Sequence, residues 1–132
     1  MKILKQVVAI FFITVLLFAC NKSSDGPAPA DPASIAGVWT GKYGNDNSSP
    51  NIFFSLHFKA GGVIEELDQS GAVIGTGTWK VENNIITGTY KWPSQTKFNI
   101  IGTYNSQLKK ILGNWGYGNS NTDGGLYELA KN

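Results

Sequence analysis

A triplet of Gly, any residue and then an aromatic residue recurs along this chain. Residues two apart in a β-strand share a face, so each Gly lies beside its aromatic partner while the mostly polar middle residue faces water. The repeat therefore predicts strands whose aromatic faces meet in a common interior. Copies stand as GVW at 37, GKY at 41, GTW at 77, GTY at 88, GTY at 102 and GNW at 113.

The rest of the chain from Ile35 onward also favours an all-β fold. Period-two stretches bounded by Gly, Asn, Asp and Ser recur, and no window of 11 residues keeps a helical apolar period. Only a brief helical turn, Pro32 to Ala36, is expected. The predicted strands are Gly37 to Tyr43, Ile52 to Lys59, Val63 to Asp68, Val73 to Val81, Ile85 to Trp92, Lys97 to Tyr104, Lys109 to Gly116 and Leu126 to Ala130.

The links between these strands are short enough for hairpins, so the strands should form a meander. A meander of eight strands leaves two bare edges unless it closes on itself. Closure at eight strands gives an interior that side chains fill or that holds one small ligand. We therefore predict an eight-stranded antiparallel up-and-down β-barrel over residues 35–132.

The alternation also predicts which side chains face the interior. In the second strand the apolar face turns inward, because a slip of one residue would bury His57 and Lys59. The run Glu65-Glu66-x-Asp68 and the pair Lys109-Lys110 are expected on the solvent face. The aromatic residues of the repeat either fill the barrel or line a ligand pocket. They are Trp39, Tyr43, Trp79, Tyr90, Tyr104 and Trp115.

The N-terminal segment has the pattern of a secretory signal peptide. Lys2 and Lys5 form its charged start, and the 12-residue apolar stretch from Val7 to Phe18 is too short to span a bilayer. The segment ends in Leu17-Phe18-Ala19-Cys20, which resembles the lipobox of bacterial lipoproteins. That resemblance implies a signal peptide over residues 1–19 and a Cys20 carrying acyl chains such as palmitate, enough for a stable membrane anchor.

The residues after Cys20 indicate in which membrane the protein is expected. Lipoprotein sorting, as the resemblance implies it, retains a protein in the inner membrane when Asp follows the lipidated Cys, and here Asn21 follows. The outer membrane is therefore expected, with the periplasmic and cell-surface sides as alternatives. Residues 20–34 are rich in Pro, Ala, Ser and Asp and are interpreted as the lipidated Cys and a flexible linker.

Composition narrows the classes of partner. The chain has 132 residues and a formal net charge of +2, which comes from Lys2 and Lys5 because residues 21–132 hold nine Lys and nine acidic residues. It has no Arg, which argues against a nucleic-acid partner. Its one Cys and one His argue against an internal disulfide framework and against a metal site built from these residues. We expect no cofactor and a monomer.

Two sets of polar residues resemble functional sites only in part. Ser55 and His57 share a strand face, but residues i and i+2 are too far apart for a nucleophile and its base, and no oxyanion motif accompanies them. Asn119 to Gly124 matches the first half of a calcium loop, yet Ala130 stands where a bidentate Glu is needed. We favour a solvated strand face and a plain hairpin loop, and we expect no enzymatic activity.

The start of the domain resembles a known family. The segment DPASIAGVW, a short turn leading into Trp39, looks like the Gly-x-Trp opening of lipocalins and other calycins. FKAGG, GTW, GTY and LGNWG are similar to elements of small lipocalin-like lipoproteins of the Bacteroidetes type. The resemblance implies an up-and-down barrel. Lipocalins usually close over the first-strand Trp with an Arg from a late strand, and this chain has no Arg.

The sequence leads to two functional hypotheses. The first is a non-catalytic lipoprotein of the cell envelope that binds a small hydrophobic or aromatic ligand in the barrel mouth, lined by the six aromatic residues named above. The second is a protein-binding module with a filled barrel, such as an enzyme inhibitor or a cell-envelope interaction protein. A cavity of about a few hundred Å³ at one mouth would favour the first. A filled interior with an apolar loop cluster would favour the second.

Overall fold

The computed structural model describes residues 29–132, so the predicted signal peptide and Cys20 lie outside the described residues. The predicted helical turn and eight strands are confirmed, and no strand end differs from its prediction by more than one residue. The elements are α1 (Pro32–Ile35), β1 (Gly37–Tyr43), β2 (Ile52–Lys59), β3 (Val63–Leu67), β4 (Val73–Glu82), β5 (Ile85–Lys91), β6 (Lys97–Asn105), β7 (Lys110–Tyr117) and β8 (Gly125–Lys131).

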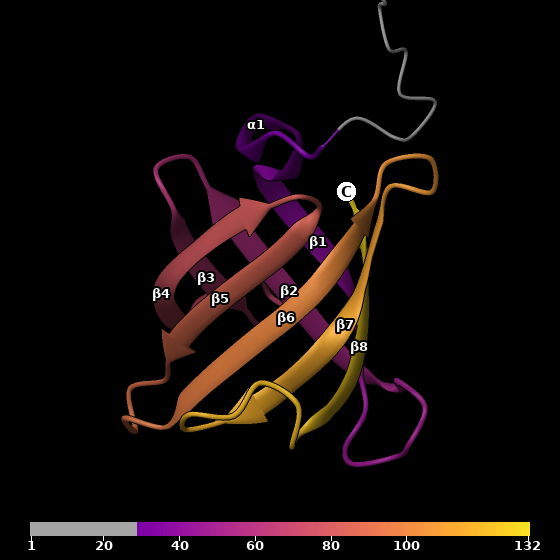
Figure 1. The fold of residues 1–132 in the computed structure, drawn as a ribbon. Coiled ribbons are helices and arrows are strands. Elements are labelled where there is room, and N and C mark those ends of the chain that lie inside the picture. Colours follow the sequence, from indigo (N-terminus) through magenta and orange to yellow (C-terminus); the bar gives the residue numbers. More distant parts are fainter. Residues whose placement is uncertain (1–28) are drawn as a thin grey trace, which may run out of the picture.

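The strands form a closed antiparallel barrel with up-and-down order (Figure 1). Each strand pairs with the next along the chain, and β8 pairs with β1 to close the sheet. The register of β1 on β2 places Trp39 opposite Leu56 and Gly41 opposite Phe54. Because opposite residues share a face, these pairs put the aromatic side of β1 and the apolar side of β2 in one interior, as the alternation predicts.

The glycines of the repeat stand where backbones approach closely. A Cβ added at Gly41, Gly77 or Gly113 would lie 2.0, 1.9 or 2.1 Å from a carbonyl oxygen of the neighbouring strand. Such distances leave no space for any side chain, so these positions accept Gly alone without a shift of the backbone. The repeat thus combines tight coiling of the strands with room for the large rings beside them.

One end of the barrel is covered by α1, which lies across it in Figure 1. The Asp31 side chain caps this short helix by accepting a hydrogen bond from the Ala33 amide at 2.9 Å. Ile35 is fully buried, and its carbonyl oxygen accepts a 2.7 Å hydrogen bond from the indole of Trp39. We call this the closed end. Among residues 29–132 no helix is long and apolar enough to cross a membrane.

A lysine from the last strand also packs against the closed end. The Lys131 ammonium lies 5.7 Å from the centre of the Trp39 ring and donates a 2.8 Å hydrogen bond to the Ser34 carbonyl oxygen. A cation at this distance from an indole face is attracted to it. Lys131 thereby connects α1, β1 and β8. It covers Trp39 from the last strand, where the resemblance to lipocalins implied an Arg that this chain does not have.

The other end of the barrel carries loops 44–51, 68–72, 92–96 and 118–124, with no helix across it (Figure 1). We call it the open end. Ile52, predicted to face the interior, is 39% exposed there because it begins β2 at the rim rather than in the core. The inner residues deeper in β2 are buried, as predicted.

Ser55 departs from the predicted solvated strand face. It projects from the outer face of β2, but only 3% of the residue is exposed. Its hydroxyl donates to the Trp39 carbonyl oxygen at 3.1 Å and lies 3.2 Å from the Thr40 hydroxyl. The prediction that it faces water is wrong, because a small hydroxyl with partners on the adjacent strand can lie flat against the sheet.

Candidate ligand-binding pocket

A pocket of about 210 Å³ occupies the barrel interior at the open end. Seven of its nine lining residues are aromatic, one is acidic and one is Thr. They come from β1, β2, β3, β5, β6 and β7 and from loop 92–96. The lining residues are Tyr43, Phe54, Glu66, Tyr90, Trp92, Thr96, Phe98, Trp115 and Tyr117.

The structure divides the six aromatic residues of the predicted lining between the two ends of the barrel. Tyr43, Tyr90 and Trp115 line the pocket. Trp39, Trp79 and Tyr104 lie outside it, in the closed half. Three of the six aromatic residues therefore lie together at the open end, and the other three pack in the closed half of the interior.

The closed half is filled by edge-to-face aromatic packing. The Trp39 ring meets the Tyr104 ring at a centroid distance of 5.7 Å, and the Phe58 ring meets the Trp79 ring at 5.1 Å. The indole of Trp79 donates to the Lys59 carbonyl oxygen at 3.0 Å. Both indole N–H groups of this half are therefore satisfied by backbone oxygens.

Phe54 lines the pocket, and its ring packs against Tyr127, which is not one of the lining residues. The two rings lie edge to face at 5.7 Å. Tyr127 is 2% exposed, and its hydroxyl has no hydrogen-bond partner among the described residues. Burial raises the pKa of this phenol far above its ordinary value. Tyr127 ends a further copy of the Gly-x-aromatic triplet, Gly125-Leu126-Tyr127, which the sequence analysis missed although the same spacing marks it.

The aromatic walls of the pocket are in mutual contact. Phe98 stacks against Tyr90 at 5.5 Å and is tilted against Trp92 at 4.8 Å. Across the pocket, Tyr43 meets Trp115 edge to face at 5.3 Å, and the Trp115 indole donates to the Gly44 carbonyl oxygen at 2.9 Å. These contacts hold the ring faces in place before any ligand enters, which lowers the ordering cost of binding.

Glu66 is the one acidic residue of the lining, and it was predicted on the solvent face. That prediction is wrong: Glu66 is 8% exposed and shares the inner face of β3 with the buried Ile64. The indole of Trp92 donates to its Oε2 at 2.5 Å, and the Tyr90 phenol lies close enough to the same carboxyl group to affect its pKa. A buried carboxyl is tolerable here because the indole donor satisfies one of its oxygens.

The environment of Glu66 shifts the acid–base behaviour of the pocket. Burial raises the pKa of Glu66, against the Trp92 indole and the nearby Tyr90 phenol, which lower it. Burial and the nearby Glu66 carboxylate raise the pKa of Tyr90 well above its usual value and raise that of Tyr43 as well. Burial therefore makes Glu66 easier to protonate than an exposed Glu and makes the phenols of Tyr43 and Tyr90 harder to ionise.

Trp92 ends the predicted strand Ile85 to Trp92 and is the first residue of loop 92–96 in the structure. It is 38% exposed, but its indole folds back over the mouth of the barrel to reach Glu66. The loop turns at Gln95, whose backbone φ is 68°, and the Trp92 carbonyl oxygen accepts a hydrogen bond from the Gln95 amide at 2.9 Å. Alternation along the predicted strand Ile85 to Trp92 places Trp92 on the same face as Tyr90, but nothing in the sequence pairs its indole with Glu66.

The two partial motifs lie outside the pocket. His57 Nδ1 faces Glu65 Oε2 at 3.4 Å on the outer surface, while the Ser55 hydroxyl bonds to β1. In loop 118–124, Asn119 Oδ1 accepts from Lys97 at 3.3 Å and Asp123 Oδ1 accepts from the Tyr117 amide at 2.9 Å. Among the described residues no group of three His, Cys, Asp or Glu side chains could hold a metal ion.

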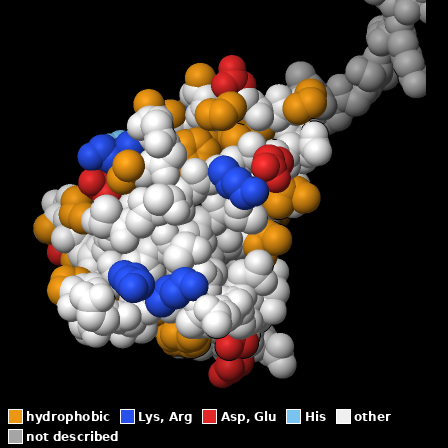
Figure 2. Space-filling view, turned by 60° about the vertical axis from the view of Figure 1, so that its left-hand side comes forward, with side chains coloured by type: hydrophobic (Ala, Val, Ile, Leu, Met, Phe, Trp, Pro, Cys, Tyr) orange, Lys and Arg blue, Asp and Glu red, His pale blue; other side chains and the backbone are white. Residues whose placement is uncertain are grey.

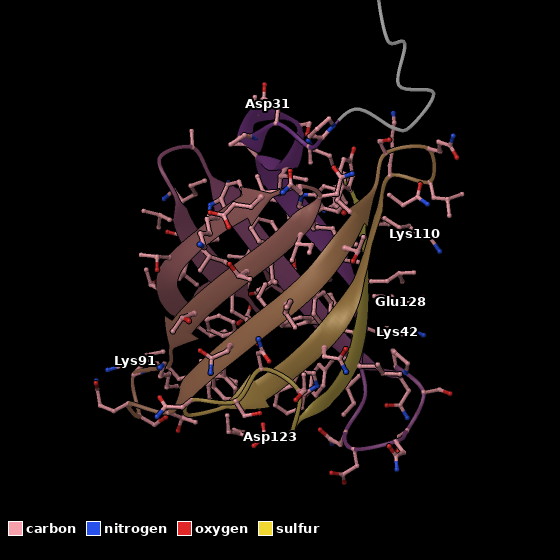
Figure 3. The ribbon with its side chains drawn as sticks, viewed as in Figure 1. Asp31, Lys42, Lys91, Lys110, Asp123 and Glu128 are labelled. Carbon is pink, nitrogen blue, oxygen red and sulfur yellow. The ribbon has the colours of Figure 1, made fainter. Side chains whose placement is uncertain are left out.

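Charges elsewhere on the described surface are scattered. On the face turned forward in Figure 2, Lys and acidic side chains meet in two places, one of which is the mixed group that contains the single His. In that group, Glu65 contacts both His57 and Lys59. Figure 3 places Lys91 and Asp123 at the open end, with Lys91 pointing away from the barrel. No protein-family model and no curated protein matches the chain.

Proposed function

We propose that this protein is a non-catalytic binding protein that takes one small, largely aromatic or apolar ligand in the pocket at the open end. The observation that carries the proposal is the cavity of about 210 Å³ walled by seven aromatic rings. Ligand sites for drug-sized molecules usually measure about 300–1,000 Å³, so a smaller molecule is expected here. Of the aromatic residues singled out from the sequence, Tyr43, Tyr90 and Trp115 belong to the proposed site.

The experiment for this proposal is a titration of intrinsic Trp fluorescence with a panel of small aromatic, aliphatic and amine compounds. Trp92 and Trp115 line the pocket, so an occupant changes the surroundings of both rings. We expect a saturable change in emission for at least one class of compound. The control is Trp115→Phe, which removes one reporter at the open end and keeps an aromatic ring in the wall. No saturable response from any class would contradict the proposal.

The proposal includes a lipid anchor and a location. The lipobox-like Leu17-Phe18-Ala19-Cys20 and the following Asn21 support a lipoprotein of the outer membrane acylated at Cys20. Mass spectrometry of the mature protein tests this, with an acylated N-terminal Cys20 as the expected result. A Cys20→Ser variant should leave the membrane fraction. An unmodified thiol at Cys20 in the mature chain would contradict the anchor.

We also propose a relationship to lipocalins, on the basis of the closed end of the barrel. The short helix α1 leading into Trp39 supports it, as does the Lys131 ammonium above the Trp39 ring, which occupies the role that an Arg has in lipocalins. The eight-stranded up-and-down barrel is consistent with this family and is not specific to it. A relationship of this kind implies ligand binding at the open mouth, in line with the pocket.

A protein-binding role is the second candidate, and the rim of the open end supports it. Apolar side chains there are exposed: Val73 is 51% exposed and Tyr117 is 48% exposed. Pro93 and Ile74 join Val73 in a shallow apolar surface beside Trp92. A small-molecule panel without effect, combined with capture of one envelope protein that Val73→Ser abolishes, would favour this second role.

A further inference from the structure

The chemistry of the pocket lining selects among small ligands. Glu66 is its only acidic residue, and the residues that line the pocket include no basic one. The nearest lysines in sequence to loop 92–96 are Lys91 and Lys97, which follow and precede inward residues and so belong to the outer face of the sheet. An occupant therefore meets aromatic faces and one carboxyl group.

A neutral apolar occupant fits this lining poorly. Filling the mouth would remove water from the Glu66 carboxyl without giving it a new partner, and an uncompensated buried charge is costly. An acidic occupant such as a fatty acid would add like-charge repulsion to the same cost. The indole of Trp92 leaves acceptor capacity on the carboxylate, which has about four lone-pair sites.

A cation can interact favourably with both the aromatic rings and the carboxyl group of the lining. Aromatic faces attract an ammonium group within about 6 Å of the ring centre, and the attraction increases when water is excluded. Tyr43, Tyr90, Trp92, Phe98 and Trp115 present rings around the same cavity that Glu66 lines. The carboxylate supplies the counter-charge at the cage wall. Methylated ammonium groups are recognised by cages of this composition because they are bulky, weakly hydrated and positively charged.

We propose that the pocket at the open end binds a small organic cation, a methyl- or alkyl-substituted ammonium, with the aromatic rings as the cage and Glu66 as the counter-charge. This inference rests on the proposed ligand-binding function and names its ligand class. The volume of about 210 Å³ limits the occupant to the cationic group and a short chain or single ring.

The experiment compares choline with 3,3-dimethylbutan-1-ol, its neutral analogue of nearly the same shape, by isothermal titration calorimetry. We expect choline to bind at least about tenfold more tightly, because only choline carries the positive charge that the aromatic rings and the carboxylate attract. Equal affinity for the two compounds would overturn the cation inference and leave the pocket function standing. Absence of binding by both, and by the whole compound panel, would contradict the pocket function itself.

Variants of two neighbouring residues give a matched comparison. Glu66→Gln keeps the size of the side chain and removes the counter-charge, so the preference for choline over the neutral compound should disappear. Glu65→Gln makes the same change one residue away on the outer face, where Glu65 contacts Lys59 at 3.0 Å, and should leave both affinities unchanged. An unchanged preference in Glu66→Gln would overturn the role of Glu66.

The parent protein provides a readout that does not depend on the variant folding. Choline keeps its charge at every pH, so its affinity should fall as Glu66 is protonated in acid, while the affinity of the neutral compound stays constant. The other titratable groups of the lining are Tyr phenols, and burial together with the Glu66 carboxylate raises the pKa of those of Tyr43 and Tyr90. Asp68 and Asp123 also lie at the open end, each hydrogen-bonded within or beside its own loop.

The pKa of Asp68 is lowered by the hydrogen bonds from Ser70 and Ala72, so this carboxyl changes its charge at lower pH than Glu66. The two titrations therefore separate along the pH axis. A choline affinity that does not change between neutral pH and the acid range in which Glu66 is protonated would overturn the proposal.

Discussion

The closed and open ends of this barrel use the same kinds of residue for different purposes. At the closed end, the indoles of Trp39 and Trp79 donate to backbone carbonyl oxygens, and their rings pack edge to face against Tyr104 and Phe58. At the open end, the Trp92 indole donates to the Glu66 carboxyl group, and the rings around it enclose a cavity. The difference lies in Trp92, whose indole donates to a side-chain carboxyl group, because the indole of Trp115 at the same end donates to a backbone carbonyl oxygen as the closed-end indoles do.

The largest expected effect is a difference in the free energy of unfolding between a variant of the closed end and a variant of the open end. Trp39→Ala should lower the free energy of unfolding by about 3–5 kcal/mol, because Trp39 is fully buried and loses both packing and its bond to Ile35. Trp92→Ala should cost less, since Trp92 is 38% exposed, and should abolish ligand binding. Urea unfolding followed by circular dichroism gives both stabilities. Equal losses in the two variants would break the distinction between the ends.

The second prediction concerns two glycines of β4. Gly77→Ala should lower the free energy of unfolding by about 1–3 kcal/mol, because its Cβ would lie 1.9 Å from the Thr89 carbonyl oxygen and the backbone must move. Gly75→Ala is the matched change toward the open end, where the nearest atoms are the rings of Trp92 and Tyr90 at 3.0 Å. Side chains yield more easily, so this variant should lose less stability and bind ligand more weakly.

Thermal unfolding of both glycine variants, with calorimetric titration of ligand, checks this pair. A Gly75→Ala variant that is less stable than Gly77→Ala would show that the open end is packed as rigidly as the closed end.

The third prediction tests the cover of the closed end. Asp31→Ala removes the N-cap of α1 and should cost about 1 kcal/mol of unfolding free energy. Ligand affinity should not change, because α1 lies at the opposite end from the pocket. Asp31→Asn keeps a capping oxygen and serves as the control. A loss of affinity in Asp31→Ala with the control unaffected would show that the two ends are coupled.

The smallest expected effect is a pH dependence of opposite sign at two adjacent residues. The pKa of Glu66 is raised by burial, so its contribution to stability is present in acid, below its pKa in the unfolded chain, and is lost as pH rises through the folded value. Glu66→Gln should therefore be at least as stable as the parent at neutral pH, and this advantage should shrink as the pH falls.

Glu65 should behave in the reverse way. The hydrogen bond from Lys59 lowers its pKa, so its contribution is present at neutral pH and is lost as pH falls through the folded value. Glu65→Gln should then be slightly less stable than the parent at neutral pH, with the difference vanishing in acid. Urea midpoints measured at several pH values check both variants. The same sign for the two variants would contradict the inward position of Glu66.

The sequence was sufficient for the barrel and insufficient for half of the site. Alternation and turn residues located every strand within one residue, because each strand has one buried face and ends at a rim of polar residues. The same alternation pointed Tyr43, Tyr90 and Trp115 inward. Which inward rings fill the core and which surround a cavity depends on their height along the barrel axis, which alternation does not encode.

Glu66 and Trp92 were missed for a different physical reason. A charged residue beside another charged residue in Val63–Leu67 is expected to face water, since a lone buried carboxyl is costly. The cost is offset by a donor 26 residues later in the chain, which no pattern in the sequence pairs with Glu66. Only the three-dimensional contact between these two residues makes either position understandable.

The described chain begins and finishes at the same end of the barrel. It enters through α1 and leaves after β8, where Lys131 reaches back to the Ser34 carbonyl oxygen, so both attachment points lie on the covered side (Figure 1). The pocket mouth is at the far side from both. Immobilising the protein on a sensor surface, a bead or a bilayer through either end would therefore present the mouth outward, and a ligand could enter and leave without passing the support.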